Sequence, residues 1–329
     1  MDRAPSPAQA YYGQRHAIAA TSDRLRRLRE AIQDPVNLSS FQWAQWFAYV
    51  REYRPDLVIE LGRGNGNSTA AVNEALHQLG HGRLVSFCLT RTWHEKTVPL
   101  LQPFVEADWF DRIEARVGNL LREDFAEIVG DARRVLLIWD AHGFEIAGCV
   151  LGNVLPVLAD REHFVIMHDI SDNRFRDKSE MRYGDEELWQ GMERAYRGDW
   201  RGARICLGWI FTLVDQAISV VDFLTRNGGE LRSADESFHR EIGGSPERRA
   251  EMQRVLAPDD WSMMGDWAWF SLNDLAAPYT FPRFTRPPLA AAPSATPRAR
   301  ETPEIRATRT RDLLRIAFRR VVDRSRRRS

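Results

Sequence analysis

The 329-residue sequence contains little cysteine and no long hydrophobic run, and these shortages exclude several classes of protein. Its three cysteines, Cys88, Cys149 and Cys206, stand far apart in apolar runs, which indicates buried thiols in a reducing cytosol rather than disulfides or a zinc site. The longest apolar stretch, residues 205–214, is too short to span a membrane, and residues 1–7 lack the apolar core of a signal peptide. We therefore predict a cytoplasmic protein.

Net charge is also absent, because 46 basic residues balance 46 acidic ones. The balance is uneven along the chain. Residues 298–329 contain twelve arginines and four acids, a surplus of +8 that leaves −8 on the remainder. An acidic body argues against nucleic acid as a partner.

The stretch that organises the chain lies within residues 57–69. Residues 57–61 are a short apolar run with one acid, Glu60, which is typical of a core strand in a parallel sheet. Three glycines follow at alternate positions: Gly62, Gly64 and Gly66. Glycine permits positive φ and lets a ligand lie against bare backbone, and Asn67 or Ser68 can cap the helix that follows. Such a turn points backbone N–H groups at a ligand.

This turn has the spacing G-x-G-x-G and a preceding carboxylate, which favour a ligand with an ammonium group over a pyrophosphate, because like charges repel. The segment resembles the nucleotide-binding motif of class I S-adenosylmethionine (SAM)-dependent methyltransferases, E/D-x-G-x-G-x-G. The resemblance implies SAM as the cofactor, with backbone room at the three glycines, Glu60 orienting the turn and the amino group of SAM, and Asn67 and Ser68 beside it. The alternative is a tight β–α turn without a ligand.

Two positions farther along bear on the rest of the cofactor. The second predicted strand, residues 83–89, ends without the acid that holds the ribose hydroxyls in the family, and Thr90 is a weak substitute. A nicotinamide dehydrogenase would need an acid at the end of the second strand and a longer glycine spacing. This sequence has neither feature, which argues against that class of enzyme. Asn119 follows the third strand, where the family often contacts the adenine amino group. Asn119 is either an adenine-binding residue or a turn asparagine.

Strand and helix patterns alternate from residue 57 onward. The further strand candidates are residues 83–89, 113–117, 135–139, 163–167 and 267–272. Alternation of strands with longer helices predicts βαβ units. The predicted fold class is therefore α/β, with a doubly wound, mostly parallel, Rossmann-like sheet and helices on both faces.

Composition divides the chain into four parts. These are a helical extension (1–38), the methyltransferase domain (39–275), a proline-rich linker (276–303) and a basic amphipathic tail (304–329). Residues 1–20 are expected to be loosely ordered, and the polar stretch at about 171–202 is typical of a lid. The tail is either solvated and disordered, or a basic helix on an anionic inner-membrane surface or on a partner protein. Both a monomer and a homo-oligomer are compatible with the sequence.

Polar residues follow two strands that are predicted to be neighbours: Asp140 and His142 after the fourth, His168 and Asp169 after the fifth. Ligands of open α/β sheets bind at this edge, and two carboxylates suit Mg²⁺. The pattern resembles metal-dependent O-methyltransferases, including the macrolide sugar methyltransferase and cephalosporin-hydroxylase-like group. This resemblance implies Asp140 and Asp169 as metal ligands, with a third ligand unassigned.

A hydroxyl acceptor must lose its proton to a general base or to the influence of a bound metal ion. His142 is the first candidate base, with Asp140 as the second catalytic residue; otherwise His142 is a metal ligand or a helix cap. We predict SAM-dependent O-methylation of a hydroxyl on a sugar or small natural product, with Mg²⁺ as the cofactor of its metal-assisted form. The alternative is a catalytically degenerate scaffold or binding protein, anchored through its basic tail.

Overall fold

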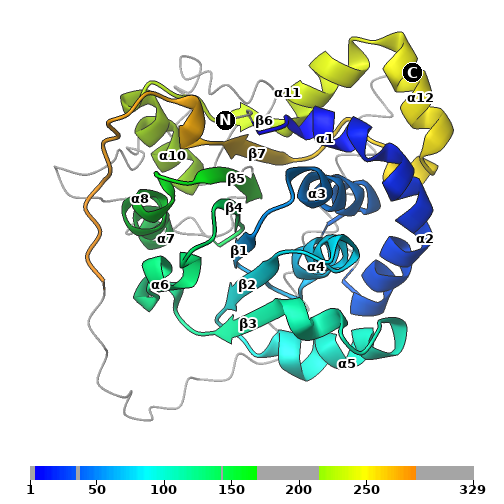
Figure 1. Ribbon diagram of the computed structural model, residues 1–329, viewed down its shortest axis with the longest axis horizontal. Helices are drawn as coiled ribbons and strands as arrows, with labels where there is room; N and C mark the ends of the chain where they lie inside the picture. The colour runs from blue at the N-terminus through cyan, green and yellow to red at the C-terminus, as the bar shows by residue number, and fades with distance from the viewer. Residues whose placement is uncertain (1–3, 35–37, 142–143, 169–214, 287–329) are drawn as a thin grey trace, which may run out of the picture. The chain divides into compact units, whose positions relative to one another are not determined.

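The computed structural model describes residues 4–34, 38–141, 144–168 and 215–286 (Figure 1). The chain divides into two units, Met1–Arg286 and Pro287–Ser329, and the second unit lies outside the described residues. The stretch predicted as a lid, at about 171–202, also lies outside them. Within the described ranges, no helix combines the length and the apolar character that a membrane crossing requires.

A seven-stranded sheet forms the centre of the first unit, in the order β3-β2-β1-β4-β5-β7-β6 (Figure 1). The strands are β1 (Leu57–Leu61), β2 (Arg83–Cys88), β3 (Ile113–Val117), β4 (Arg134–Trp139), β5 (Glu162–His168), β6 (Arg232–Ser233) and β7 (Trp267–Phe270). Strands β1 to β5 pair in parallel, whereas β7 is antiparallel to both β5 and β6. The chain reverses its direction across the sheet between β1 and β4, which makes this boundary the switch point. The predicted doubly wound, mostly parallel α/β fold is confirmed.

Alternate residues of the strands pack into two cores, one on each face of the sheet. Val58 of β1 belongs to the first core, and its neighbours Leu57 and Ile59 belong to the second. The first core is covered by α1 (Pro7–Gly13), α2 (Arg15–Ile32), α3 (Ser40–Tyr53), α4 (Asn67–Leu79), α5 (Val98–Leu101), α11 (Ala234–Phe238) and α12 (Pro246–Val255). The second is covered by α6 (Phe125–Val129), α7 (Phe144–Cys149), α8 (Leu155–Leu158) and α10 (Asp215–Arg226). Burial on both faces explains why β1 and β4 are almost entirely apolar, with Glu60 and Arg134 as the exceptions.

Short helical turns connect these elements. They are η1 (Trp93–Thr97), η2 (Gln102–Phe104), η3 (Trp109–Arg112), η4 (Leu120–Arg122), η5 (Val150–Val154), η8 (His239–Gly243), η9 (Pro258–Asp260) and η10 (Leu272–Asp274). Three of these turns, η1, η5 and η8, are π-helical. Because η1 directly follows β2, it places Trp93 beside the glycine turn.

The N-terminal residues are more regular than the sequence indicates. Helix α1 starts with a capping box, in which Gln9 N donates to Ser6 Oγ at 3.1 Å and Ser6 N donates to Gln9 Oε1 at 2.9 Å. Tyr11 is fully buried, and its ring stacks on Trp261 with 6.2 Å between centroids. For the described residues 4–20, the expectation of loose order was wrong, because their order depends on aromatic partners far along the chain.

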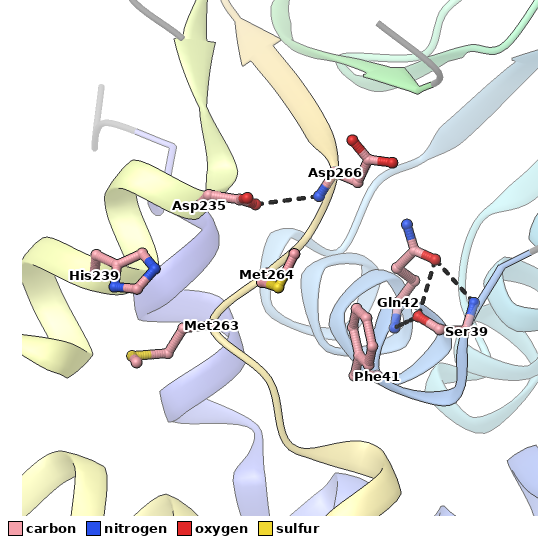
Figure 2. Close-up of a pocket in the computed structure, with 8 residues that line it drawn as sticks. All are labelled: Ser39, Phe41, Gln42, Asp235, His239, Met263, Met264 and Asp266. Carbon is pink, nitrogen blue, oxygen red and sulfur yellow. Dashed lines mark hydrogen bonds between the residues drawn. The ribbon is translucent and has the colours of Figure 1, made fainter. Parts of the chain in front are cut away.

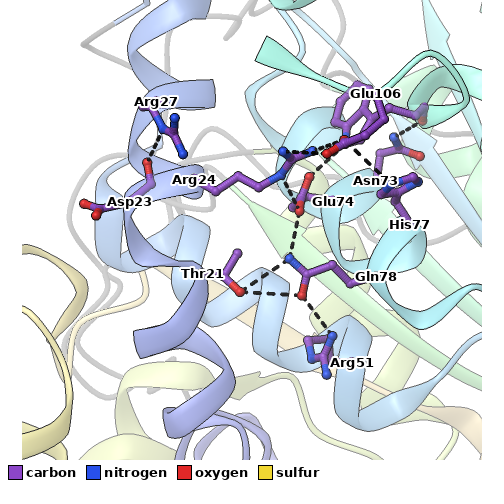
Figure 3. Close-up of polar contacts among 11 residues, drawn as sticks. Thr21, Asp23, Arg24, Arg27, Arg51, Asn73, Glu74, His77, Gln78 and Glu106 are labelled. Carbon is purple, nitrogen blue, oxygen red and sulfur yellow. Dashed lines mark hydrogen bonds and ion pairs between the residues drawn. The ribbon is translucent and has the colours of Figure 1, made fainter.

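A buried carboxylate fastens α2 to α4 (Figure 3). Glu74 of α4 is 1% exposed and accepts 2.8 Å hydrogen bonds from Arg24 Nε, Gln78 Nε2 and Trp109 Nε1. Arg24 also donates through Nη1 to Glu106 at 3.1 Å. Burial lowers the pKa of Arg24, but Glu106 and Glu74 outweigh that effect, and the pKa is raised. The network fixes the N-terminal helix to the helix that begins at the glycine turn.

Candidate functional site

The first glycine of the turn brings β1 against the end of β4. Gly62 has φ of 103°, and a Cβ added to it would lie 2.7 Å from the carbonyl carbon of Asp140 and from the nitrogen of Ala141. Asp140 N donates to Leu61 O at 2.8 Å in the same place. Only glycine permits this combination of positive φ and close backbone contact. Gly62 therefore sets the distance between the glycine turn and Asp140.

The other two glycines differ in what surrounds them. Gly64 has φ of 54°, and among the described residues no atom beyond its chain neighbours lies within 4 Å of an added Cβ, so its backbone faces open space there. Gly66 has φ of 89°, and an added Cβ would meet the indole ring of Trp93. Of the three glycines predicted to make room for a cofactor, Gly64 does face open space, whereas Gly62 and Gly66 allow contacts within the protein.

The N-terminus of α4 has no side-chain cap. Gly66 occupies the N-cap position in a left-handed conformation, and Asn67 and Ser68 lie buried in the first turn of the helix. The prediction that Asn67 or Ser68 caps this helix was wrong, because the positive φ of Gly66 already turns the chain into it. Asn67 Oδ1 has no hydrogen-bond partner among the described residues although it is buried. This helix start presents backbone N–H groups that suit an anionic or polar ligand.

Glu60 is fully buried in β1 behind the turn. Its Oε2 accepts a 2.6 Å hydrogen bond from Thr69 Oγ1 and a second from Ser86 Oγ, while Oε1 has no partner among the described residues. Burial raises the pKa of Glu60, and the hydroxyls of Ser68, Ser86 and Thr69 oppose that rise. Glu60 thus ties β1 to β2 and to the first turn of α4, which orients the turn.

A buried arginine within the same turn joins it to β2 and β3. Arg63 is 2% exposed, and its Nη1 donates to Ser86 O at 2.6 Å and to Ser86 Oγ at 3.1 Å. Its Nη2 donates to Arg116 O at 3.1 Å in β3. Burial lowers the pKa of Arg63, and the charge of Glu60 opposes that effect. Ser86 therefore bridges an acid and a base that partly neutralise each other inside the sheet.

The ends of β2 and β3 carry the positions that bear on a nucleoside. Thr90, beyond β2, is exposed, and its Oγ1 lies 3.0 Å from Thr92 Oγ1. Asn119, beyond β3, is exposed and accepts a 3.0 Å hydrogen bond from Leu121 N through Oδ1, as the cap of η4. The amide oxygen of Asn119 is thus engaged in a turn.

An acid from the N-terminal extension also reaches the turn. Asp34, just beyond α2, accepts hydrogen bonds through Oδ2 from Asn65 Nδ2 at 2.8 Å and from Asn67 Nδ2 at 3.3 Å. Sequence reasoning missed Asp34, because it precedes β1 and belongs to no motif. Its carboxylate contacts the glycine turn and is partly exposed, whereas Glu60 is fully buried.

Asp140 and His168 meet at the ends of β4 and β5. His168 Nδ1 lies 3.2 Å from Asp140 Oδ1, with side-chain exposures of 9% and 22%. His168 Nε2 lies 3.3 Å from Gln42 Nε2. Because the Gln42 amide also donates to Gly265 O at 2.8 Å and accepts through Oε1 from Ser39 N at 2.8 Å, its nitrogen is the atom that faces His168. His168 Nε2 is then the acceptor, and Nδ1–H donates to Asp140.

The other predicted catalytic and metal residues, His142 and Asp169, lie outside the described residues. Among the residues that the structure describes, no group of three His, Cys, Asp or Glu side chains is arranged to hold a metal ion. Gln42 was missed from the sequence, because it belongs to no motif and only its neighbour His168, 126 positions later, gives it a place at the site. His168 was recognised as part of the strand-end cluster, but without a role.

A cavity of about 740 Å³ opens beside Gln42 (Figure 2). It lies between the N-terminus of α3, the α11–η8 region and the segment that leads into β7. Its apolar wall is made by Phe41, Met263 and Met264, and its polar residues include Asp235, His239 and Asp266. Since β7 is antiparallel to β5, the start of β7 lies at the end of β5 where His168 stands.

The strand order, the antiparallel β7 and the glycine turn between β1 and α4 define a Rossmann-like fold of the methyltransferase type. No protein-family model matches the chain, and no curated protein matches it. It is similar in structure to part of the SAH-bound methyltransferase PaMTH1 from Podospora anserina, with 13% identity, a TM-score of 0.35, and coverage of 45% of this chain and 62% of that one.

Two further solved structures are similar to the same extent. The O-methyltransferase TomG from Streptomyces achromogenes, in complex with SAM, is 18% identical with a TM-score of 0.34, over 45% of this chain and 66% of that one. An O-methyltransferase from Bacillus cereus in complex with SAH is 15% identical with a TM-score of 0.33, over 47% of this chain and 68% of that one. The chain thus spans less than two thirds of PaMTH1 and TomG, and its fold assignment rests on the sheet topology.

Proposed function

We propose that the protein is a SAM-dependent methyltransferase that acts on a hydroxyl of a sugar or small natural product. The observation that carries this proposal is the contact between Gly62 and the backbone of Asp140. It sets the glycine turn and the Asp140–His168 pair side by side at the switch point of the sheet, where ligands of such folds bind.

The residues at the turn fit a cofactor with an amino-acid group. Gly64 leaves open space, the first turn of α4 offers backbone N–H groups to a carboxylate, and Asp34 offers a carboxylate to an ammonium group. Glu60 is fully buried and orients the turn through Thr69 and Ser86, while its Oε1 has no partner among the described residues. The chemistry that bound SAM supplies is an electrophilic methyl group.

The strand-end residues supply the remaining requirement, which is removal of the proton of the acceptor hydroxyl. Asp140 is the more exposed member of the pair and takes this proton on its carboxylate. His168 orients the carboxylate through Nδ1, and Gln42 fixes the tautomer of His168. A carboxylate fixed in one orientation also keeps the acceptor oxygen in line with the methyl group. That alignment lowers the reaction barrier beyond the effect of the carboxylate as a base. In the metal-assisted form of the proposal, Asp140 and Asp169 would hold Mg²⁺, which would supply Lewis-acid chemistry to the acceptor hydroxyl.

Calorimetric titration of the full chain with S-adenosylhomocysteine (SAH), with and without Mg²⁺, tests the proposal. We expect micromolar binding for the wild type. Asp140→Asn retains that affinity to within about twofold, because Asp140 faces the acceptor, and it abolishes methyl transfer from labelled SAM to a panel of hydroxylated acceptors. Asp131→Asn, which removes an exposed acid before β4, is the matched control. Absence of SAH binding under both conditions overturns the proposal.

A catalytically degenerate scaffold is the second candidate. Two observations favour it: β2 ends without an acid for the ribose, and Trp93 covers Gly66. In this case SAH does not bind, and residues 304–329 anchor the protein to an anionic membrane surface or to a partner protein. Co-sedimentation of the full chain with anionic vesicles, compared with neutral vesicles, measures that anchoring separately from the cofactor.

A further inference from the structure

The glycine turn is fixed to the end of β2, on the side of β1 opposite β4. Gly62 N and Arg63 N donate to Phe87 O at 3.2 and 2.9 Å. The end of β3 is fixed to the end of β2, since Gly118 N donates to Cys88 O at 3.0 Å. Because β1, β2 and β3 are successive strands of the sheet (Figure 1), a ligand that begins at the turn can extend over the ends of β2 and β3.

Apolar side chains lie exposed at these two strand ends. Leu89, which follows β2, leaves 77% of its surface exposed, and Val117, the last residue of β3, leaves 41%. Val117 is paired in register with Cys88, so the two exposed side chains belong to neighbouring strand ends. A ligand that covers this apolar surface gains free energy from its burial, and a flat nucleobase is a group of that kind.

The polar groups at the same strand ends are neutral and already paired. Thr90 Oγ1 lies 3.0 Å from Thr92 Oγ1 and 3.4 Å from Cys88 Sγ, and Asn119 Oδ1 accepts from Leu121 N at 3.0 Å. Thr90 and Asn119 are exposed. A hydrogen bond from a ribose hydroxyl to either side chain therefore replaces a hydrogen bond to water, and its net gain is small.

Strong binding of a ribose would require a carboxylate, whose two oxygens can accept from both hydroxyls. Residues 88–92 and 118–122, at the two strand ends, contain no acid. The next acids along the chain, Glu95 and Glu123, are paired with arginines at 3.2 and 2.7 Å. The described residues at this edge thus suit a base better than a ribose diol.

We propose that this edge holds the cofactor by its base and its amino-acid group, and that binding does not depend on the ribose hydroxyls. The base lies over Leu89 and Val117, and the amino-acid group lies at the glycine turn. The inference rests on the proposed function for the identity of the cofactor. It assigns an unusual specificity: analogues of SAM and SAH that lack the 2′- or 3′-hydroxyl are accepted almost as well as the parent compounds.

Calorimetric titration of the full chain with SAH and with its 2′-deoxy and 3′-deoxy analogues tests the inference. We expect each analogue to bind within about fivefold of SAH, because an exposed, neutral hydrogen bond contributes no more than that to affinity. Hydroxyls held by a carboxylate would cost the analogues roughly tenfold or more. A loss beyond fivefold for either analogue overturns the inference.

A substitution at the end of β2 locates the base. Leu89→Ser removes apolar surface and weakens SAH and both analogues by the same factor, roughly 3- to 10-fold. Phe104→Ser changes a side chain of η2 that is 47% exposed, and it leaves all three affinities unchanged as the matched control. Wild-type affinities in Leu89→Ser contradict the position of the base.

A second substitution examines the hydroxyl of Thr90. Thr90→Val keeps the shape of the side chain and removes its hydroxyl. We expect SAH and the 2′-deoxy analogue to respond alike. A loss of affinity confined to SAH would show that Thr90 holds the ribose and would overturn the inference.

Adenosine and 2′-deoxyadenosine separate this inference from the proposed function. If SAH binds and an analogue falls beyond the fivefold limit, the inference fails alone. If SAH does not bind, but both nucleosides bind alike and lose affinity in Leu89→Ser, the base site stands and the methyltransferase proposal fails. If neither SAH nor the nucleosides bind, both fail.

Discussion

His168 lies 3.2 Å through Nδ1 from Oδ1 of Asp140, and this contact joins the ends of two neighbouring parallel strands. Its other ring nitrogen faces the amide of Gln42 at 3.3 Å, so the imidazole is held from both sides. The ring also meets Trp46 edge-on, with 5.6 Å between centroids. A histidine that is held in this way positions Asp140, which is why the proposed reaction gives the acceptor proton to the carboxylate.

The glycine turn allows a matched comparison of two substitutions. Gly62→Ala places a methyl group against the backbone of Asp140 and lowers the free energy of unfolding by about 2–4 kcal/mol, because neither strand end can retreat. Gly64→Ala meets no atom of the described residues beyond its chain neighbours, so only its positive φ matters and the loss is about 1 kcal/mol. Urea unfolding measures both. Equal losses would contradict the difference in surroundings that we describe.

The sheet was predictable because parallel strands that are buried on both faces leave runs that are almost entirely apolar, of which β1 and β4 are examples. Asp140 and His168 could be placed at one edge for the same reason, since both follow such runs. The contacts that require each glycine of the turn were not predictable. Gly66 accommodates Trp93 rather than open space, and that contact depends on a π-helical turn that no periodicity indicates.

Residues that come from helices before β1 escaped prediction altogether. Gln42 contacts His168 across 126 positions of sequence, and Asp34 contacts Asn65 across 31. Local patterns describe which residues share a strand or a helix face, but they do not describe which helix end arrives at the sheet edge. That depends on packing of α2 and α3 on α4, and on the burial of Glu74 beneath Arg24.

The buried Glu74 allows a test of that packing. Glu74→Gln replaces one acceptor oxygen by an NH₂ group, so at least one of its donors on Arg24, Gln78 and Trp109 is left without an acceptor. We expect the free energy of unfolding to fall by about 2–3 kcal/mol. Glu30→Gln removes one partner of the exposed pair with Arg26 in α2 and should change it by less than about 0.5 kcal/mol. Chemical denaturation of both variants checks the expectation, and a similar loss in both would refute it.

The thiol of Cys149 makes stability depend on pH in the alkaline range. Burial raises its pKa from 9.0 to about 11. Between these values the unfolded chain loses the proton while the folded protein keeps it, so the unfolded state is favoured as pH rises. The stability that the protonated thiol contributes is fully present below pH 9. Above pH 11 it is lost, and the free energy of unfolding is then lower by about 2–3 kcal/mol.

Cys149→Ala removes this part of the alkaline slope, and because a buried sulfur is lost the variant is less stable than the wild type at neutral pH. Denaturation of wild type and variant at matched pH values between 8 and about 11 measures the difference in slope. Cys88→Ala, which changes a half-buried thiol at the end of β2, serves as the control for the loss of a cysteine elsewhere in the sheet. Parallel slopes for wild type and Cys149→Ala would show that the thiol is not protected.

Asp34 tests whether the N-terminal extension belongs to the cofactor site. Asp34→Asn keeps an oxygen that can accept from the amides of Asn65 and Asn67, so the turn keeps its geometry while the negative charge is lost. Because the carboxylate would face the ammonium group of the ligand, we expect SAH affinity to fall roughly 3- to 10-fold with unfolding free energy changed by less than about 0.5 kcal/mol. Asp23→Asn removes an acid of α2 whose side chain is 85% exposed and leaves SAH affinity unchanged. If Asp34→Asn binds SAH like the wild type, the carboxylate fastens the turn and does not contact the ammonium group of the cofactor.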